Sequence, residues 1–461
     1  MDGWLKAGLG YVPRWIDYQV QHLAQPGCAI AIAHQGEVVL EAAFGVADLS
    51  TGEPLTPRHR FRVASHSKTF TAAGILKLKD RGLLRLDDGV GSFVSGLHPD
   101  IAAVTVQQLL SHSGGLVRDG ADSGQFTNHR PFLSTAELKA DLALAPPYGA
   151  AERFKYSNHG YGLLGLIIEA VTGEPYTAWI TREIVQPAGL AETAADIGLM
   201  TGGTLARGHS TRLPLGRRVV IPGDNVTNDV ASATGFVSTA ADLVRFFAQL
   251  SPMSDSGLLS PLSRRDMTRR HWQDSESTLE RYYGLGTISG ALKGWDWFGH
   301  SGSFPGTLSR TVVFPAQSLA ISVLTNAIDG PAQLWVDGIA QILKAFRAGG
   351  APREELADWS GRWWMLWGAV DLVPIGGKVF ASPAALTPPL TEVSEIEVSG
   401  RDSGKVIRAS GFFSPGEPVA RLRGALGEVS EIRLGGTRLV SQSAFAEELV
   451  GRYQRGSKDG A

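Results

Sequence analysis

Apolar residues in the first part of the chain predict a strand pair followed by a buried helix. Residues 27–45 are rich in β-branched and apolar residues on either side of Gln35-Gly36, a dipeptide suited to a tight turn. Residues 65–81 are rich in Ala, Leu and Lys and end at Gly82, a usual helix terminator. Their apolar positions cover most of a helix circumference, so we expect a buried central helix.

Similar patterns recur further along the chain. Residues 161–172 and 239–250 predict two more helices, the second with a Ser-Thr cap and an acidic residue in its first turn. Residues 297–325 return to strand character, and residues 334–346 predict a closing helix. Strands at both ends with helices between them favour an α/β layer in which the first and last strands share one sheet.

A change in composition predicts a domain boundary near residue 348. The run 348–352 is rich in Gly and Ala and ends in Pro, and short strands separated by Gly and Pro turns follow it. That spacing is typical of a small all-β sandwich or barrel. We therefore expect domains at 1–348 and 349–461. We expect four tryptophans at the start of the second domain to serve in core and interdomain packing: Trp359, Trp363, Trp364 and Trp367.

Composition and charge exclude several classes of protein. Apolar residues make up 43% and charged residues 19% of the 461, as in a globular protein of more than one domain. The formal net charge of -2 gives no reason to expect nucleic acid or a membrane as partner. Cys28 is the only cysteine, which excludes an intrachain disulfide. No signal peptide or membrane span is visible, so we expect a cytoplasmic protein, or a periplasmic one if a leader has been removed.

Ser65 and Lys68 are the first candidate for chemistry. Residues three apart share one face of a helix, so the Lys68 amine can lie over the Ser65 oxygen. Serine needs a neighbouring base to act as a nucleophile, and a desolvated lysine can serve. No other lysine of the chain has a serine three positions before it.

Two further motifs complete a constellation. Tyr156 and Asn158 form the only Tyr-x-Asn of the chain, just before the second predicted helix. We expect a lysine ammonium beside Tyr156 to favour its phenolate, so that the tyrosine can relay protons. Asn158 suits the binding of Lys68 and of a substrate carbonyl. His300 and Gly302 open the later strand region, where a glycine permits close approach of a substrate backbone.

With these three motifs in this order, the chain resembles the penicillin-recognising serine hydrolases: class C β-lactamases, D,D-peptidases, D-aminopeptidases and family VIII esterases. The resemblance covers about residues 15–346 and implies a β-lactamase-like α/β fold, an antiparallel sheet flanked by helices with a helical subdomain. The C-terminal all-β domain resembles the lipocalin-like additions of some peptidase members. The segments 109–115, 283–286 and 324–326 repeat secondary motifs of the family.

The resemblance implies an acyl-enzyme mechanism. Ser65 attacks a carbonyl while Lys68 and Tyr156 share the roles of general base and acid, and which of the two takes the first proton stays open. By family position, the backbone N–H groups of Ser65 and Ser303 hold the oxyanion. The mechanism requires neither a metal nor another cofactor, and no spacing typical of metal ligands is present.

The third motif bears on the substrate. β-Lactamases and D,D-carboxypeptidases usually carry lysine at the position of His300, which is mostly neutral at pH 7. We therefore expect an amide or peptide hydrolase of the D-aminopeptidase or D-amino-acid amidase type, acting on a small molecule or short peptide. A carboxylesterase or weak β-lactamase, and a non-hydrolytic penicillin-binding sensor or scaffold, remain as alternatives. Oligomeric state is open, and a homo-oligomer is compatible with the chain.

Three other histidines lie close to these motifs. On a helix, His66 points away from Ser65 and Lys68. We expect His112 to be a hydrogen-bond partner that stabilises its own turn. For His159, a place lining the site and an exposed position on the helix are equally open.

Overall fold

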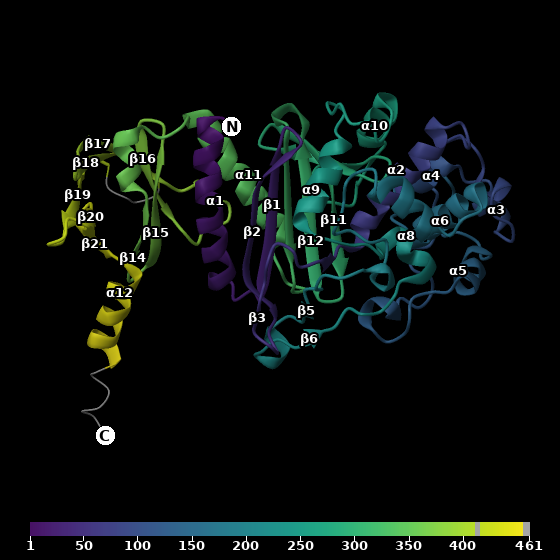
Figure 1. Ribbon diagram of the computed structural model, residues 1–461, viewed down its shortest axis with the longest axis horizontal. Coiled ribbons are helices and arrows are strands. Elements are labelled where there is room, and N and C mark those ends of the chain that lie inside the picture. The colour runs from purple at the N-terminus through teal and green to yellow at the C-terminus, as the bar shows by residue number, and fades with distance from the viewer. Residues whose placement is uncertain (411–414, 455–461) are drawn as a thin grey trace, which may run out of the picture. The chain divides into compact units, whose positions relative to one another are not determined.

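The computed structural model describes residues 1–410 and 415–454, which form two compact units (Figure 1). One unit combines Met1–Ala24 with Asp337–Ala461, and the other is Gln25–Val336. Helix α11 (Ala332–Gly349) runs through the residue at which one unit gives way to the other. The division into domains 1–348 and 349–461 remains a proposal.

The larger unit is built on an antiparallel sheet. Strand β1 (Gly27–His34) pairs with both β2 (Glu37–Asp48) and β13 (Leu319–Thr325), so the expectation that the first and last strands share one sheet is confirmed. Gln35 and Gly36 between β1 and β2 both have positive φ, as a tight hairpin turn requires. Within the described residues, nine strands follow in the order β3, β2, β1, β13, β12, β11, β10, β9, β8. The others are β3 (Glu53–Pro54), β12 (Thr307–Phe314), β11 (Trp295–Phe304), β10 (Ile288–Leu292), β9 (Arg281–Tyr283) and β8 (Trp272–Gln273).

Three of the predicted helices form at the expected places. Helix α2 (Ser67–Asp80) is buried along most of its length, as its apolar pattern predicts. Helix α9 (Ala240–Gln249) packs on the sheet against β1, β12 and β13. Helix α6 (Asn158–Thr172) packs against α2 within a helical region at one end of the unit (Figure 1). That region also contains α3 (Pro99–Ala102), α4 (Val106–Leu110), α5 (Thr135–Leu142), α7 (Tyr176–Ile180) and α8 (Ala231–Thr234).

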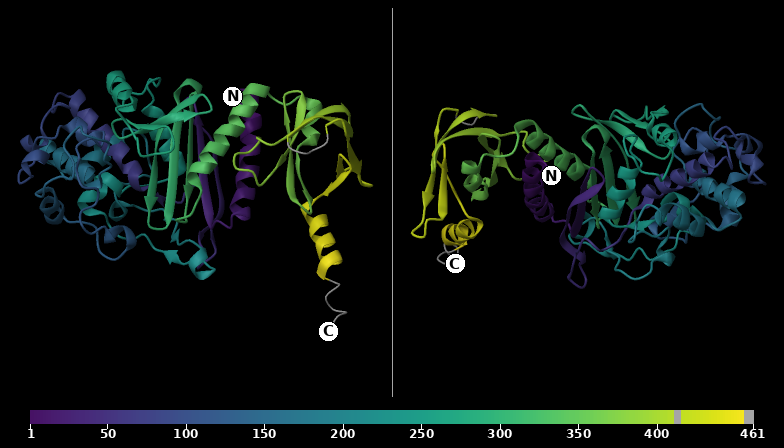
Figure 2. Two further views of the ribbon diagram at one scale, coloured as in Figure 1. Left: turned by 180° about the vertical axis from the view of Figure 1, so that it is seen from behind. Right: turned by 45° about the horizontal axis from the view of Figure 1, so that its top comes forward.

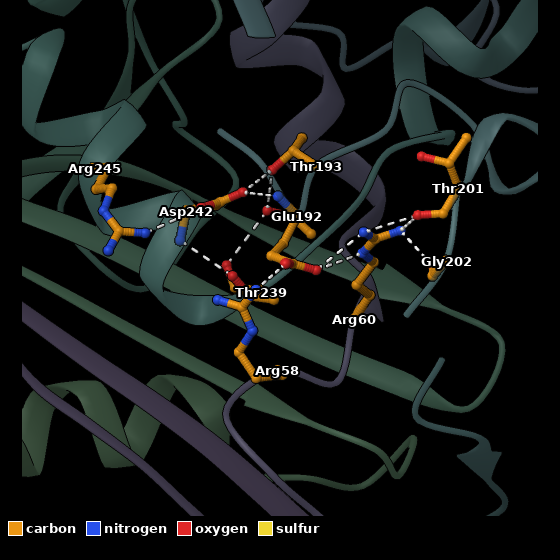
Figure 3. A network of polar contacts seen from close by, with 10 residues as sticks. Arg58, Arg60, Glu192, Thr193, Thr201, Gly202, Thr239, Asp242 and Arg245 are labelled. Carbon is orange, nitrogen blue, oxygen red and sulfur yellow. Dashed lines mark hydrogen bonds and ion pairs between the residues drawn. The ribbon is translucent and has the colours of Figure 1, made fainter. Parts of the chain in front are cut away.

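A polar network fixes the chain that leads to the Ser-x-x-Lys motif (Figure 3). The Thr239 side chain accepts the Asp242 N–H and caps α9, which confirms the predicted helix start. The Asp242 carboxylate in turn accepts the N–H of Glu192 at 2.8 Å. The Glu192 carboxylate accepts two hydrogen bonds from the Arg60 guanidinium, at 3.0 and 3.1 Å. Arg60 directly precedes β4 (Phe61–Arg62), so the approach to Ser65 is tied to the start of α9.

The smaller unit contains the predicted all-β domain. It is a closed barrel of eight strands within the described residues, from β14 (Gly361–Met365) to β21 (Thr437–Val440). Figure 2 shows it from two further directions. Trp359 is buried in the barrel core, but Trp367 is 88% exposed, so the expected packing role is wrong for Trp367. Trp367 lies in the tight turn after β14, which projects side chains away from the barrel wall. The strands between are β15 (Gly368–Ile375), β16 (Lys378–Pro383), β17 (Ser394–Gly400), β18 (Ser403–Ala409), β19 (Pro418–Arg423) and β20 (Val429–Leu434).

The smaller unit also contains α1 (Gly3–His22), which the sequence patterns did not predict. Trp15 of α1 is fully buried against Gly338 of α11. Because Gly338 has no side chain, α1 and α11 can approach closely there. The Tyr11 hydroxyl donates to Asp371 of β15 at 2.9 Å. Among the described residues, every helix is too short or too polar to cross a membrane.

Candidate active site

Ser65 lies in a strained turn that leads into α2. The turn is the 3-10 segment η1 (Ala64–His66), so Ser65 just precedes the α-helix whose first turn it was expected to occupy. The Val63 N–H donates to the Phe236 carbonyl at 3.0 Å and holds the turn in place. Ala64 has φ +47, a left-handed conformation that costs energy for a residue with a Cβ atom. The strained turn leaves the Ser65 side chain partly exposed.

Lys68 is fully buried beneath Ser65. Its Nζ lies 3.2 Å from Ser65 Oγ and donates to Asn158 Oδ1 at 2.6 Å and to the Ala233 carbonyl at 2.9 Å. Burial lowers the pKa of Lys68 well below its usual range, although the nearby carboxylate of Asp119 opposes the shift. A neutral amine gives its two N–H groups to these two acceptors, which leaves its lone pair for the Ser65 hydroxyl.

Tyr156 lies above the same amine, with its ring centroid 4.8 Å from Lys68 Nζ. Burial raises the pKa of Tyr156, and this outweighs its hydrogen bond to Ser65 and the nearby Arg118, which both lower it. The expectation that a lysine ammonium favours the Tyr156 phenolate is therefore wrong. Both groups are desolvated, and burial favours the uncharged form of each, because it lowers the pKa of the amine and raises the pKa of the phenol.

Asp119 and Arg118 join this cluster, and no sequence motif pointed to them. Asn158 Nδ2 donates to Asp119 Oδ1 at 2.5 Å, which orients the amide oxygen of Asn158 toward Lys68. Arg118 Nε lies 3.1 Å from Asp119 Oδ2, and the Arg118 carbonyl accepts the Asn158 N–H at 2.9 Å. Asp119 therefore fixes the amide flip of Asn158, while the Arg118 side chain stays largely exposed at 64%.

The third motif lies on β11. His300 is buried, with Nε2 3.0 Å from the Tyr283 hydroxyl, and burial keeps its pKa well below the usual value, so the imidazole is neutral. A Cβ atom on Gly302 would lie 2.1 Å from the Val63 carbonyl oxygen. Gly302 thus permits close approach of the protein's own backbone beside Ser65, whereas the sequence suggested a substrate backbone. Ser303 follows it as an exposed residue.

The structure separates two other histidines from the cleft. His66 Nε2 lies 3.0 Å from Thr311 Oγ1, so the ring points into the core as expected, and burial lowers its pKa to about 3. His159 is neither a lining residue nor an exposed one. It is buried, with Nε2 2.7 Å from Asp141 of α5, because the first turn of α6 faces that helix.

A cleft of about 640 Å³ opens over Ser65. Every predicted site residue except Lys68 lines it: Ser65, Tyr156, Asn158, His300, Gly302 and Ser303. Among the described lining residues, Asp274 is the one carboxylate, and Arg281 binds it through two nitrogens at 2.8 and 2.6 Å. Aromatic side chains form much of the remaining wall: Phe126, Phe154, Tyr282, Tyr283 and Phe304. In residues 1–410 and 415–454, no group of three His, Cys, Asp or Glu side chains is arranged to hold a metal ion.

Comparison with known proteins shows the family to which this chain belongs. Residues 12–344 match the Beta-lactamase family, so the chain belongs to the β-lactamase family. The protein flp of Staphylococcus aureus (strain N315) is 31% identical over 189 residues, which are 40% of this chain and 37% of flp. The chain therefore matches little more than a third of that relative's length.

Two solved structures share the fold. The octameric penicillin-binding protein homologue from Pyrococcus abyssi has a TM-score of 0.65 and 24% identity, covering 94% of this chain and 99% of that one. D-amino acid amidase from Ochrobactrum anthropi SV3, complexed with L-phenylalanine, has a TM-score of 0.65 and 22% identity over 73% of this chain and 99% of that one. The predicted fold class, a β-lactamase-like domain with an additional C-terminal barrel, is confirmed for this member of the β-lactamase family.

Proposed function

We propose that this protein hydrolyses amide or peptide bonds through an acyl-enzyme on Ser65, as a D-aminopeptidase or D-amino-acid amidase. One observation carries the proposal. A buried amine, Lys68 Nζ, lies 3.2 Å from the Ser65 hydroxyl at the floor of an open cleft. A desolvated amine of lowered pKa beside a hydroxyl is the arrangement that activates a serine nucleophile.

In the proposed reaction, Lys68 takes the Ser65 proton as Oγ attacks the substrate carbonyl. The backbone N–H groups of Ser65 and Ser303, two residues that line the cleft, are proposed to stabilise the oxyanion. Tyr156, held as a neutral phenol, then protonates the leaving nitrogen, and the C–N bond breaks to give the acyl-enzyme. In the second half-reaction water attacks the ester and gives one proton to the Tyr156 phenolate, while Lys68 returns its proton to the Ser65 oxygen as the ester C–O bond breaks, so the acid product leaves and both groups regain their starting state.

The neutral His300 and the aromatic wall support the substrate class. A neutral imidazole offers no charge to an anionic penicillin, and the wall suits an apolar or aromatic side chain. The fold neighbour from Ochrobactrum anthropi is a D-amino acid amidase, which fits this proposal. The α-ammonium of such a substrate would have Asp274 as its lining carboxylate.

A carboxylesterase or weak β-lactamase is the second candidate. It is favoured by the ion pair in which Arg281 Nε and Nη2 both donate to Asp274 Oδ2, because this pair already compensates the charge of that carboxylate. A substrate without a free α-amine needs no such partner. Both candidates use the same acyl-enzyme on Ser65.

Hydrolysis of D- and L-alanine p-nitroanilides and of a short p-nitrophenyl ester separates the candidates. Cleavage of the D-anilide that is lost in Ser65→Ala supports the amidase proposal. Ester turnover without anilide cleavage would contradict it and support the esterase. A stable acyl adduct without turnover of any of the three would instead indicate a penicillin-binding sensor.

We also propose that the chain forms a homo-oligomer. The proposal rests on the octameric Pyrococcus abyssi homologue, which matches 94% of this chain. Light scattering coupled to size-exclusion chromatography tests it, and a monomer at assay concentration would contradict it.

A further inference from the structure

We propose that His112 positions Tyr156, by using its ring nitrogen and its carbonyl to hold the backbone on both sides of the tyrosine. The inference rests on the proposed role of Tyr156 as proton donor. His112 belongs to the Ser-His-Ser-Gly-Gly turn after α4. Among the described residues, no hydrogen bond joins it to Ser65 or Lys68.

Two backbone amides flank Tyr156, and His112 accepts both of them. The Lys155 N–H donates to the His112 carbonyl at 2.7 Å. The Ser157 N–H donates to His112 Nδ1 at 3.1 Å. The His112 ring also packs on the Tyr156 ring, with 4.2 Å between centroids. Backbone and ring of Tyr156 are thus held by one residue, which restricts where its hydroxyl can lie.

These contacts fix the chemical state of His112. A backbone N–H can only donate, so Nδ1 must be unprotonated and the ring proton must be on Nε2. Nε2 is buried and has no hydrogen-bond partner among the described residues, and the His112 ring packs against the rings of Tyr161 and Tyr283. Burial lowers the pKa of His112 well below its usual value. The imidazole is therefore kept as a neutral acceptor.

The backbone at this position limits which substitutions are informative. His112 has φ +57, in the left-handed region that asparagine and glycine adopt at low cost. Asparagine places an acceptor oxygen close to the position of Nδ1, and glycine places none. His112→Asn and His112→Gly therefore differ in the acceptor while both accommodate the backbone and both lose the ring.

The test measures kcat and KM of these variants on an anilide and on a p-nitrophenyl ester, per active site titrated with a fluorophosphonate. We expect His112→Gly to lower kcat for the anilide about tenfold or more with little change in KM, because a general acid is misplaced. The ester should lose less, because p-nitrophenolate leaves without a proton. His112→Asn should stay within about fivefold of wild type.

His159→Asn is the matched control, because it shortens another buried histidine, bound to Asp141, in the same helical region. We expect it to lower the melting temperature and to leave the ratio of anilide to ester turnover unchanged. A purely structural role of His112 would give the same pattern as this control.

A double-mutant cycle with Tyr156→Phe isolates the pathway. If His112 acts through Tyr156, His112→Gly lowers kcat for the anilide by less than about threefold when it is made in the Tyr156→Phe background, where the phenol is absent. Equal losses in the two backgrounds, or equal kcat for the Asn and Gly variants, would overturn the inference. A Tyr156→Phe variant whose kcat for the anilide equals that of wild type would overturn the proposed role of Tyr156 and the inference with it.

If the His112→Gly variant does not fold, the folded His112→Asn variant decides. A loss of kcat beyond about fivefold in that variant overturns the inference, and a smaller loss supports it.

Discussion

At the scale of single residues, the site depends on the charge state of one buried amine. Among the residues that the structure describes, no carboxylate contacts Lys68 directly, and the two acceptors of its N–H groups are the neutral oxygens of Asn158 and Ala233. Neutral acceptors stabilise a buried ammonium less than a carboxylate acceptor would. Burial is therefore the dominant effect, and it lowers the pKa of Lys68. Two charged residues beyond this contact shell, Asp119 and Arg118, act on the amine in opposite directions.

Because Asp119 and Arg118 shift the pKa of Lys68 in opposite directions, replacing them should shift the pH profile of kcat/KM in opposite directions. Asp119 raises the pKa of Lys68, so Asp119→Asn should move the acidic limb of kcat/KM to lower pH. Arg118 lowers that pKa, so Arg118→Gln should move the limb to higher pH. The measurement is kcat/KM for the ester over the pH range in which the protein stays folded.

Arg153→Gln serves as the control for that experiment. Arg153 is an exposed arginine stacked on Tyr148, and it is not among the charges that shift the pKa of Lys68. Its substitution should leave the limb in place. Shifts of the same sign for Asp119→Asn and Arg118→Gln would contradict Lys68 as the titrating base.

Spacing along the chain predicts only the part of the site that is local. Ser65 and Lys68 are three residues apart, and any helical turn brings them together. Asp119 lies 39 positions from Asn158, and Ala233 lies 165 positions from Lys68, so only the tertiary fold joins them. The protonation of Tyr156 was mispredicted for the same reason, because its burial cannot be known before the fold.

At the scale of elements, the site depends on the packing of β11 against the turn that carries Ser65. Gly302 of β11 faces the Val63 carbonyl so closely that a Cβ atom would lie 2.1 Å from it, and 2.5 Å from Ser309 Oγ. The obstacle is backbone, which cannot rotate away as a side chain can. The absence of a Cβ atom at Gly302 therefore allows β11, which carries Ser303, to lie this close to the turn that carries Ser65.

Gly302→Ala should destabilise the protein and impair its activity together. We expect the free energy of unfolding to fall by about 1–3 kcal/mol, as for other overpacked sites. We also expect kcat to fall, because β11 must move away from Ser65. Denaturant unfolding and ester turnover measure the two effects. Gly257→Ala is the control, because a Cβ atom there meets nothing within 4 Å. A Gly302→Ala protein with normal stability and activity would contradict the tight packing.

Elements were predictable where their signals are local. Helix α9 begins at Thr239 with Asp242 in its first turn, as the capping pattern indicates. Strands β16 and β19 have weaker local signals, because Pro383 ends one and Pro418 begins the other, and such residues also mark turns. Each of these strands pairs with its neighbours in the sequence, whereas the pairing of β14 with β21 that closes the barrel joins residues far apart in the chain. Helix α1 contains Pro13, which further weakened its signal.

At the scale of the whole molecule, the two ends of the chain belong to one unit. Tyr11 donates to Asp371 across 360 positions of sequence, and the Arg362 guanidinium binds the same carboxylate through two nitrogens at 2.8 and 2.9 Å. Asp371 is fully buried, so the hydrogen bonds from both partners offset the cost of burying its carboxylate. The expected boundary near residue 348 put residues 1–24 in the first domain, and no sequence pattern indicated that α1 belongs with the barrel.

The shared carboxylate predicts energetic coupling between α1 and the barrel. Asp371→Asn should cost about 3 kcal/mol of unfolding free energy, and Tyr11→Phe about 1 kcal/mol. The double variant should lose about 1 kcal/mol less than the sum, because Tyr11 has no charged acceptor once Asp371 is replaced. Thermal and denaturant unfolding of the full chain measure these losses. Tyr148→Phe, in the other unit, should be additive with Asp371→Asn, and additivity for Tyr11→Phe would contradict the assignment of α1.

The central claim is that Ser65 carries the acyl group. Its most direct test is acid quenching of the protein during turnover of a p-nitrophenyl ester, followed by mass spectrometry of the intact chain and of its peptides. We predict one added acyl group on the peptide that contains Ser65, and no adduct and no turnover in Ser65→Ala. An adduct on another residue, or turnover that persists in Ser65→Ala, would contradict the account.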